Sequence, residues 1–267
     1  MRFKIKKYLV IIWAFLVRDW QRRWSYKLNF IAMLLYPIIW VSVFAILGKT
    51  VDDAGAMNIA GGFSTYIVTG IITWRFIRVG FFDSSWSIRW EQHIGTFKNI
   101  YMIPHHLLVP VSATAISGFT VSLVNFVEMW LVAEFVFGIH LNLTIASFLF
   151  LVLAWMSIIG FGFAIAGIAV LYKEIQAVFT VIFFSFQFFC GVFFPISVLP
   201  GAAQYISRAI PITYALHGIR TSMTQGYIPM KDILIMPISG LVGIVIGLVT
   251  LHLCLKKALK EGKLERY

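Results

Sequence analysis

Six long apolar stretches dominate the chain, separated by short polar or basic segments. A helix needs about 20 apolar residues to cross a hydrocarbon core of about 30 Å, and each stretch reaches that length. Helices are expected because lipid offers no partner to free backbone groups and the alternating pattern of a membrane barrel does not occur. The predicted spans are Leu28–Gly48, Phe63 to about Phe82, Leu107–Phe137, Leu143–Leu171, Ile175–Phe194 and Ile233–Leu255.

The segment before the first span has its own short apolar run, Tyr8–Val17. Ten helical residues cover only about 15 Å, too little to cross the bilayer. Arg18 and Asp19 follow the run where a secretory signal would carry a small-residue cleavage site. Basic residues and Trp at both flanks favour a helix lying at the cytoplasmic interface.

The stretch from Pro195 to about Pro229 is too long for a simple turn between spans five and six. Tyr205, Ile206, Ala209 and Ile210 recur in it at helical spacing, which predicts a short helix dipping into the outer leaflet. The predicted fold class is therefore all-α integral membrane, with six transmembrane helices, a cytoplasmic interfacial N-terminal helix and this short outer helical segment. We expect one domain over 1–267, with the interfacial helix at 1–27, the spans at 28–255 and a cytoplasmic tail at 256–267.

Composition supports the membrane and indicates the orientation. Only 12% of the 267 residues are charged and 60% are hydrophobic, whereas soluble domains carry about 25% charged residues. Eighteen of the 22 Lys and Arg residues fall in the N-terminal segment, the inner end of span two and the link after it, the link after span four, and the tail. The positive-inside rule then places both termini in the cytoplasm of a multi-pass protein of the plasma (inner) membrane. The net charge of +11 is expected to meet anionic lipid headgroups, with no nucleic acid as partner.

No pattern in the chain predicts a catalytic or metal site. His105 and His106 are adjacent, so they point to different helix faces, and no second ligand pair has metal spacing. Gly48-Lys49-Thr50 ends like a phosphate-binding loop, but Val43 stands where the first glycine belongs. We expect no catalytic residue, no metal and no cofactor bound by this chain itself.

Ionisable residues inside the spans are candidates for a translocation path, because each costs a few kcal/mol at the bilayer centre unless it is paired or hydrated. Arg75 and Arg78 share one helix face. If span two continues toward Ile88, Arg75 lies near mid-membrane and Asp83 or Glu128 becomes a candidate partner; the alternative is snorkelling to the cytoplasmic surface. Glu128 either lines a polar path or locks a helix contact.

Span five is dense in phenylalanine, and span six carries paired glycines. The phenylalanines either pack against lipid and helices or form an apolar slide for a greasy cargo at a subunit interface, with Phe186, Phe189 and Phe193 as its candidates. Phe lacks the polar groups with which Tyr and Trp hold sugars, which favours a lipid-like or drug-like cargo. Gly243 and Gly247 form a small-xxx-small pair that predicts close helix packing.

Two segments outside the spans contain the most informative sequence motifs of the chain. Glu91-x-x-x-Gly95-Thr96, followed by Pro104, resembles the cytoplasmic motif of ABC-2 type transporter permeases. The run from Gly191 through Pro195 to Pro200, and then Pro211-Ile-Thr-Tyr214 through Arg220, is similar to the second signature of that family. The resemblance covers nearly the whole chain. His93 and Lys98 depart from the acidic or polar residues frequent at their positions, which leaves the charge pattern of the coupling surface open.

The resemblance implies a mechanism that the residues alone do not reveal. Two permeases, identical or closely related, would form a dimer, and each would dock a separate ATPase subunit that holds ATP and Mg. The cargo implied is drug-like or lipid-linked, with a lipid-linked polysaccharide as the alternative; an ion-coupled transporter, an intramembrane enzyme and a structural membrane protein are the other classes considered. Coupling to the ATPase would fall to Glu91, His93, Gly95, Thr96 and Lys98, and the exit would be shaped by Gly191, Pro195, Pro200, Pro211 and Tyr214.

Overall fold

The computed structural model describes residues 2–57, 59, 61–93, 108–172 and 176–261, and this part of the chain is helical throughout apart from its connections, so the all-α class is confirmed. A π-helical turn, Val132–Val136, extends α5, and a 3-10 turn, Ile196–Val198, precedes α8. The α-helices are α1 Arg2–Ser25, α2 Lys27–Asp53, α3 Phe63–His93, α5 Leu108–Leu131, α6 Ile145–Leu171, α7 Gln176–Phe189, α8 Gly201–Ala209, α9 Pro211–Thr224 and α10 Met230–Lys260.

Four helices of the described chain are long and apolar enough to cross a membrane, and they correspond to predicted spans one, three, four and six. They are Lys27–Asp53, Ser112–Val136, Ile145–Leu171 and Met230–Ala258. The crossing of α3 and of α7, and with it the total of six spans, stays a prediction.

The two remaining helices differ in length from their predicted spans. Helix α3 continues past Phe82 to His93, and its 31 residues extend for about 46 Å, longer than the hydrocarbon core. Helix α7 ends at Phe189, so the last phenylalanines of the predicted span lie in the turn that follows. Gly191 adopts a left-handed conformation in this turn, with φ +78°, which an apolar pattern does not reveal.

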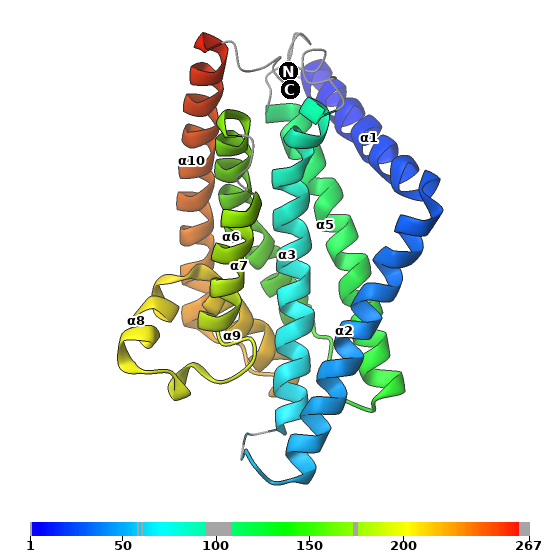
Figure 1. Cartoon of the computed structure of the whole chain (residues 1–267), viewed down its shortest axis with the longest axis vertical. Coiled ribbons are helices and arrows are strands. Elements are labelled where there is room, and N and C mark those ends of the chain that lie inside the picture. The colour runs from blue at the N-terminus through cyan, green and yellow to red at the C-terminus, as the bar shows by residue number, and fades with distance from the viewer. Residues whose placement is uncertain (1, 58, 60, 94–107, 173–175, 262–267) are drawn as a thin grey trace.

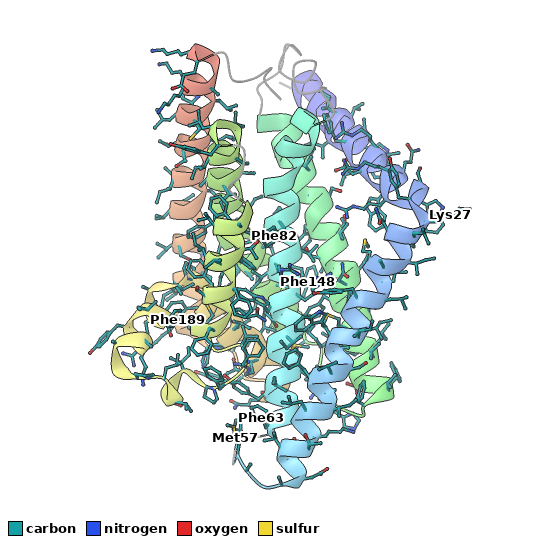
Figure 2. All side chains as sticks on the ribbon, viewed as in Figure 1. Lys27, Met57, Phe63, Phe82, Phe148 and Phe189 are labelled. Carbon is teal, nitrogen blue, oxygen red and sulfur yellow. The ribbon has the colours of Figure 1, made fainter. Side chains whose placement is uncertain are left out.

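Helices α2, α3, α5, α6, α7 and α10 alternate in direction along the bundle, and α1 runs in the same direction as α2 (Figure 1). The N-terminal end of α1 and the C-terminal ends of α3, α6 and α10 gather at one end, which we call the terminal end. Figure 2 shows the link after α2, with Met57 and Phe63, at the opposite end. The described helix ends that border the basic links after α3 and α6, and the C-terminal end of α10, therefore lie at one end of the bundle, and its exposure to the cytoplasm stays a prediction.

Helix α1 runs obliquely from the terminal end toward Lys27, where α2 begins (Figure 2). It is longer than the predicted apolar run and is held against α5. The Trp20 indole N–H donates to the Thr120 hydroxyl at 3.3 Å, and Asp19 is buried with Arg18 at 3.3 Å and Arg22 at 3.8 Å. The Trp20 hydrogen bond links α1 to α5, whereas the two ion pairs lie within α1.

Glycines allow α6 and α10 to pack with their backbones in contact. A Cβ on Gly160 of α6 would overlap the backbone of Gly243, and one on Gly247 would overlap the Gly160 carbonyl. The Ser157 hydroxyl adds a hydrogen bond to the Met236 carbonyl at 3.1 Å. The close packing predicted for the small-xxx-small pair is confirmed, and its partner is α6.

The start of α3 is held by a carboxylate from the preceding helix. Asp52 accepts hydrogen bonds from the backbone N–H groups of Phe63 at 2.6 Å and Ser64 at 2.9 Å. These are two of the N–H groups that a helix leaves without an intrahelical partner at its first turn. Asp52 therefore acts as a cap supplied from α2, and it ties the two helices together.

We expect Asp52→Ala to destabilise the protein by about 1–2 kcal/mol, the cost of losing an N-terminal cap. Its neighbour Asp53 is exposed, so Asp53→Ala removes the same charge without the cap. Thermal unfolding of the detergent-purified variants measures the difference. Equal midpoints for the two variants would contradict the capping role.

Candidate functional site

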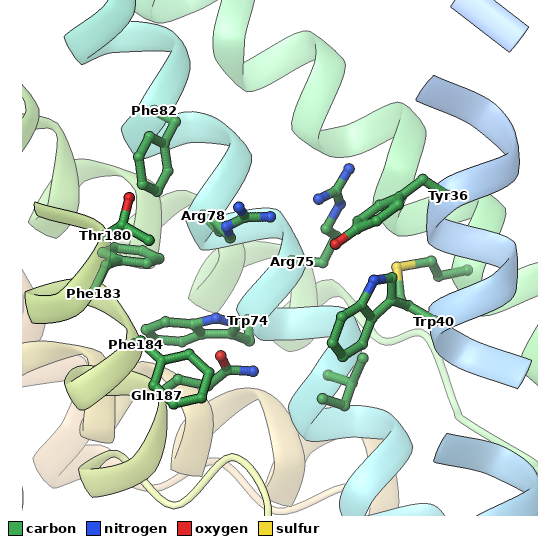
Figure 3. Close-up of a pocket in the computed structure, with 12 residues that line it drawn as sticks. Tyr36, Trp40, Trp74, Arg75, Arg78, Phe82, Thr180, Phe183, Phe184 and Gln187 are labelled. Atoms are coloured by element: carbon green, nitrogen blue, oxygen red, sulfur yellow. The ribbon is translucent and has the colours of Figure 1, made fainter. Parts of the chain in front are cut away.

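A cavity of about 170 Å³ opens on the face of α3 that lies between α2 and α7. We call it the aromatic cavity, and Figure 3 shows aromatic rings from all three helices turned into it. Two arginines of α3 and two neutral polar side chains of α7 complete it. Its lining is Tyr36, Trp40, Ile71, Trp74, Arg75, Arg78, Phe82, Met129, Thr180, Phe183, Phe184 and Gln187.

Helical spacing explains why these side chains converge. Tyr36 and Trp40 are four residues apart on α2, and Trp74, Arg78 and Phe82 repeat the same spacing on α3, so each set shares a face. Phe183 of α7 closes the wall, because its ring lies 4.6 Å from the Trp74 ring and 5.4 Å from the Phe82 ring, centroid to centroid. Ring pairs at these separations are favourable beyond their buried area.

Both arginines lie against aromatic rings. The Arg75 guanidinium carbon is 4.8 Å from the centroid of the Tyr36 ring, and that of Arg78 is 5.3 Å from the Phe82 ring. Such contacts stabilise a cation where water is scarce. Figure 3 shows the Arg75 head group turned toward Tyr36, on the α2 side of the cavity.

Glu128 of α5 lies within electrostatic range of Arg75, and their pairing, one of the alternatives from the sequence, stays a prediction. The Arg75 guanidinium acts favourably on the Glu128 carboxylate, whose Oε2 atom is buried without a hydrogen bond. The structure thus brings together two of the candidate path residues from different helices. The other candidate for Arg75, Asp83, lies on α3 among residues whose side chains are outside the described set.

The three phenylalanines proposed for the path lie elsewhere. Phe186, Phe189 and Phe193 are half-buried against the core and do not line the aromatic cavity. Phe193 contacts Phe44 of α2, with ring centroids 5.6 Å apart. Phe183 and Phe184 from the same helix supply the cavity wall instead. The part of Phe186, Phe189 and Phe193 in a path stays a prediction.

Comparison with known proteins identifies the membrane domain. Residues 8–224 match the ABC-2 type transporter family. The chain belongs to this family. The permease is also 24% identical, over 200 residues, to the "Putative transport permease ycf38" of Cyanophora paradoxa, an alignment that covers 72% of this chain and 67% of that one. It is a multi-pass membrane protein, and ABC-2 permeases as a class pair with ATPase subunits.

The predicted coupling motif of the permease begins in the last turn of α3. Glu91 and His93 belong to this helix, which ends at the terminal end of the bundle. Gly95, Thr96 and Lys98 lie outside the described residues. The role of all five in coupling stays a prediction.

The residues expected to shape the exit mark the boundaries of short elements after α7. Gly191 forms the turn that ends α7, Pro195 precedes the 3-10 turn and Pro200 precedes α8. Pro211 is the first residue of α9, where its missing N–H costs no helical hydrogen bond. The Tyr214 hydroxyl donates to the Arg208 carbonyl at 2.8 Å and so links α9 to α8.

The outer segment contains two helices where one short helix was predicted. Tyr205 and Ile206 belong to α8, and both are exposed. Ile210 is extended and separates α8 from α9. The apolar face of α9, by contrast, is buried against the bundle, with Ile212, Ala215, Leu216 and Ile219 all inaccessible or nearly so.

Sequence reasoning missed the aromatic residues that make the cavity. Tyr36, Trp40 and Trp74 lie inside apolar spans, where a ring is ordinary. The available signal was the four-residue spacing of Tyr36 and Trp40 within one span, away from the interfaces where Tyr and Trp usually gather. Without the neighbouring helices, this spacing does not indicate what the rings face.

Proposed function

We propose that this permease is the membrane subunit of an ATP-driven exporter of lipophilic cargo, and that the aromatic cavity contacts the apolar part of that cargo. The supporting observation is the cavity itself, which joins six aromatic rings to two guanidinium groups. At about 170 Å³ it is smaller than the 300–1,000 Å³ of typical ligand pockets. It therefore suits a ring or a short acyl segment of a larger molecule.

The rest of the cargo would contact a second permease, identical or closely related. Helices α2 and α7, which flank the cavity, present exposed apolar side chains, including Ile39 and Val43 on α2 and Val181 and Phe184 on α7. Surfaces of this kind suit lipid or another subunit. A dimer that joins these faces would place two aromatic cavities along one route.

Both termini would face the cytoplasm of the plasma (inner) membrane, with the motif around Glu91 and Gly95 seated on the ATPase subunit. ATP and Mg would be held by that subunit. Binding of ATP would favour the closed ATPase pair and shift the two permeases toward the conformation that releases cargo outward. The segment from Gly191 to Tyr214 would border the release route.

A lipid-linked polysaccharide is the second candidate cargo. Its specific support is that Tyr36, Trp40 and Trp74 all line the cavity. Their hydroxyl and indole N–H groups offer the polar contacts with sugars that phenylalanine lacks. The lipid portion would then occupy the membrane beside α2 and α7.

Transport in reconstituted vesicles tests both the class and the cargo. The tagged permease is purified with the ATPase that accompanies it, and uptake of a fluorescent lipophilic drug and of a lipid-linked oligosaccharide is compared with and without ATP. Trp40→Ala and Trp74→Ala should lower the rate, whereas Trp13→Ala, on the exposed face of α1, should not. Transport driven by an ion gradient without an ATPase would overturn the proposal.

Coupling is tested at the cytoplasmic motif. Glu91→Ala and Gly95→Pro should lower ATP-driven transport about tenfold or more while the permease still inserts in the membrane, because the ATPase would close without moving it; tenfold corresponds to about 1.4 kcal/mol. Transport per hydrolysed ATP is the measurement. Glu261→Ala removes an exposed carboxylate from the tail and serves as the matched control. Wild-type transport in both motif variants would contradict the coupling role.

A further inference from the structure

A second cavity lies near the opposite end of α3 from the coupling motif. It encloses about 300 Å³ between the first turn of α3, the turn after α7, and α9. No residue is shared between its lining and that of the aromatic cavity. We call it the Arg220 cavity, after the cationic side chain in its wall.

Arg220 is fixed in this wall by three contacts. Its guanidinium carbon lies 3.5 Å from the centroid of the Tyr66 ring. Its Nη2 donates to the carbonyls of Tyr66 at 3.2 Å and Gly191 at 3.3 Å, and the Tyr66 hydroxyl donates to the same Gly191 carbonyl at 3.0 Å. The charge is therefore held in one place by a ring and by two backbone groups.

No anion within the described chain balances this charge. Arg220 makes no ion pair with any described residue, and no Asp or Glu is among the described residues that line the cavity. The Nε atom is buried without a hydrogen-bond partner. A guanidinium has five N–H donors, and Nη2 donates to only two acceptors, the carbonyls of Tyr66 and Gly191. A cation removed from water without a counter-charge is unfavourable, so the site is complementary to an anion.

Other side chains in the lining add further hydrogen-bonding groups. The Thr65 hydroxyl and the Gln225 amide line the cavity, and neither side chain is engaged in a hydrogen bond with the described residues. His217 also lines it, and its Nδ1 lies 2.6 Å from Oδ2 of the buried Asp232. The Asp232 carboxylate is therefore engaged by His217, and Nε2 of the ring remains able to bind a ligand in the cavity.

We propose that the Arg220 cavity binds a phosphate group, either on the headgroup of an amphiphile or as the free ion, with Arg220 as its anchor. A tetrahedral phosphate has acceptor oxygens for donors that converge from several directions, here from α3, from α9 and from the residue after α9. Guanidinium–phosphate contacts are charge-assisted and among the stronger hydrogen bonds in proteins. The site is independent of the cargo assigned to the aromatic cavity.

Binding to the full chain in a neutral maltoside detergent tests the site. Isothermal titration with dodecyl phosphate and, separately, with inorganic phosphate is carried out on the wild type, Arg220→Gln and Arg208→Gln. Arg208 is exposed on α8, so its replacement removes the same charge outside the cavity. We expect about tenfold weaker binding or more in Arg220→Gln, as for loss of a charged hydrogen-bond partner, and unchanged binding in Arg208→Gln.

The two probes separate the two sources of phosphate. Equal affinity for both assigns the site to the free ion, and binding of dodecyl phosphate alone assigns it to an amphiphile headgroup. Because Arg220 also supports two backbone carbonyls, the double variant Thr65→Val with Gln225→Ala is measured beside it and should bind several-fold more weakly. The proposal is overturned if the wild type binds neither probe, if Arg220→Gln folds and binds like the wild type, or if the double variant is unaffected.

Discussion

Gly160→Leu is expected to prevent stable folding of the permease. A Cβ at this position would overlap the backbone of Gly243 on α10, and backbone cannot move aside as a flexible side chain can. Overpacking a tight interior costs about 1–3 kcal/mol and occasionally more, and a leucine against backbone belongs at the upper end. The yield of monodisperse protein after detergent extraction, and its unfolding temperature, give the measurement.

The matched control is Gly201→Leu, at the start of α8, where an added Cβ meets nothing within 4 Å. It should extract and unfold like the wild type. Alanine gives a finer comparison within α10. Gly247→Ala would overlap the Gly160 carbonyl, whereas Gly243→Ala would meet the Ser157 carbonyl at an ordinary 3.4 Å. We therefore expect Gly247→Ala to destabilise and Gly243→Ala to be tolerated; equal effects would contradict this packing of α6 on α10.

The sequence motif predicts the same packing for Gly243 and Gly247, whereas their packing in the structure differs. Spacing four residues apart predicts that both face a neighbouring helix. It contains no information about which helix that is or how its backbone is offset. The partner residue, Gly160, belongs to a different apolar run, so only the assembled pair of helices shows that an added Cβ would overlap backbone at Gly247 and not at Gly243.

Hydropathy predicted the helices well where an apolar run and a helix end together. The predicted span Leu143–Leu171 matches α6, which begins two residues later, at Ile145, where Thr144 and Ser147 form a capping box. It was less accurate where the two differ. Polar residues do not stop a helix, so α3 continues beyond Phe82. An apolar run need not be helical throughout, so α7 ends before Phe193.

The charged residues of the candidate site could be predicted from the sequence, but its aromatic residues could not. Arg75 and Glu128 stand out because ionisable residues are rare in spans, and the sequence offered Glu128 as one of two candidate partners for Arg75, which acts on that carboxylate electrostatically. Tyr36 and Trp40 do not stand out in an apolar run. Their function depends on α3 and α7, which lie far away in the sequence.

Arg75→Glu should produce the second large effect. It would place two carboxylates where Arg75 now acts on Glu128, and a charge without a counter-charge at membrane depth costs about 3 kcal/mol. Both the unfolding temperature and ATP-driven transport should fall sharply. Adding Glu128→Arg restores opposite charges in reversed order and should recover most of the stability, an interaction that a double-mutant cycle measures directly.

Arg78→Glu provides the specificity control for this rescue. Arg78 lies on the same helix face but stacks on Phe82, so Glu128→Arg should not restore it. Rescue of both reversals, or of neither, would contradict the pairing.

Glu128→Gln then separates the two interpretations of the carboxylate. Glutamine retains the size of the side chain and removes its charge. If Glu128 only locks α5 against α3, transport should fall in proportion to stability, and stabilising conditions should restore it. If Glu128 lines the path, transport should fall while the unfolding temperature stays near that of the wild type. Full transport in Glu128→Gln would show that Glu128 is not part of the path. Arg75, which lies against the Tyr36 ring, would then be the polar group that the cargo contacts in the aromatic cavity.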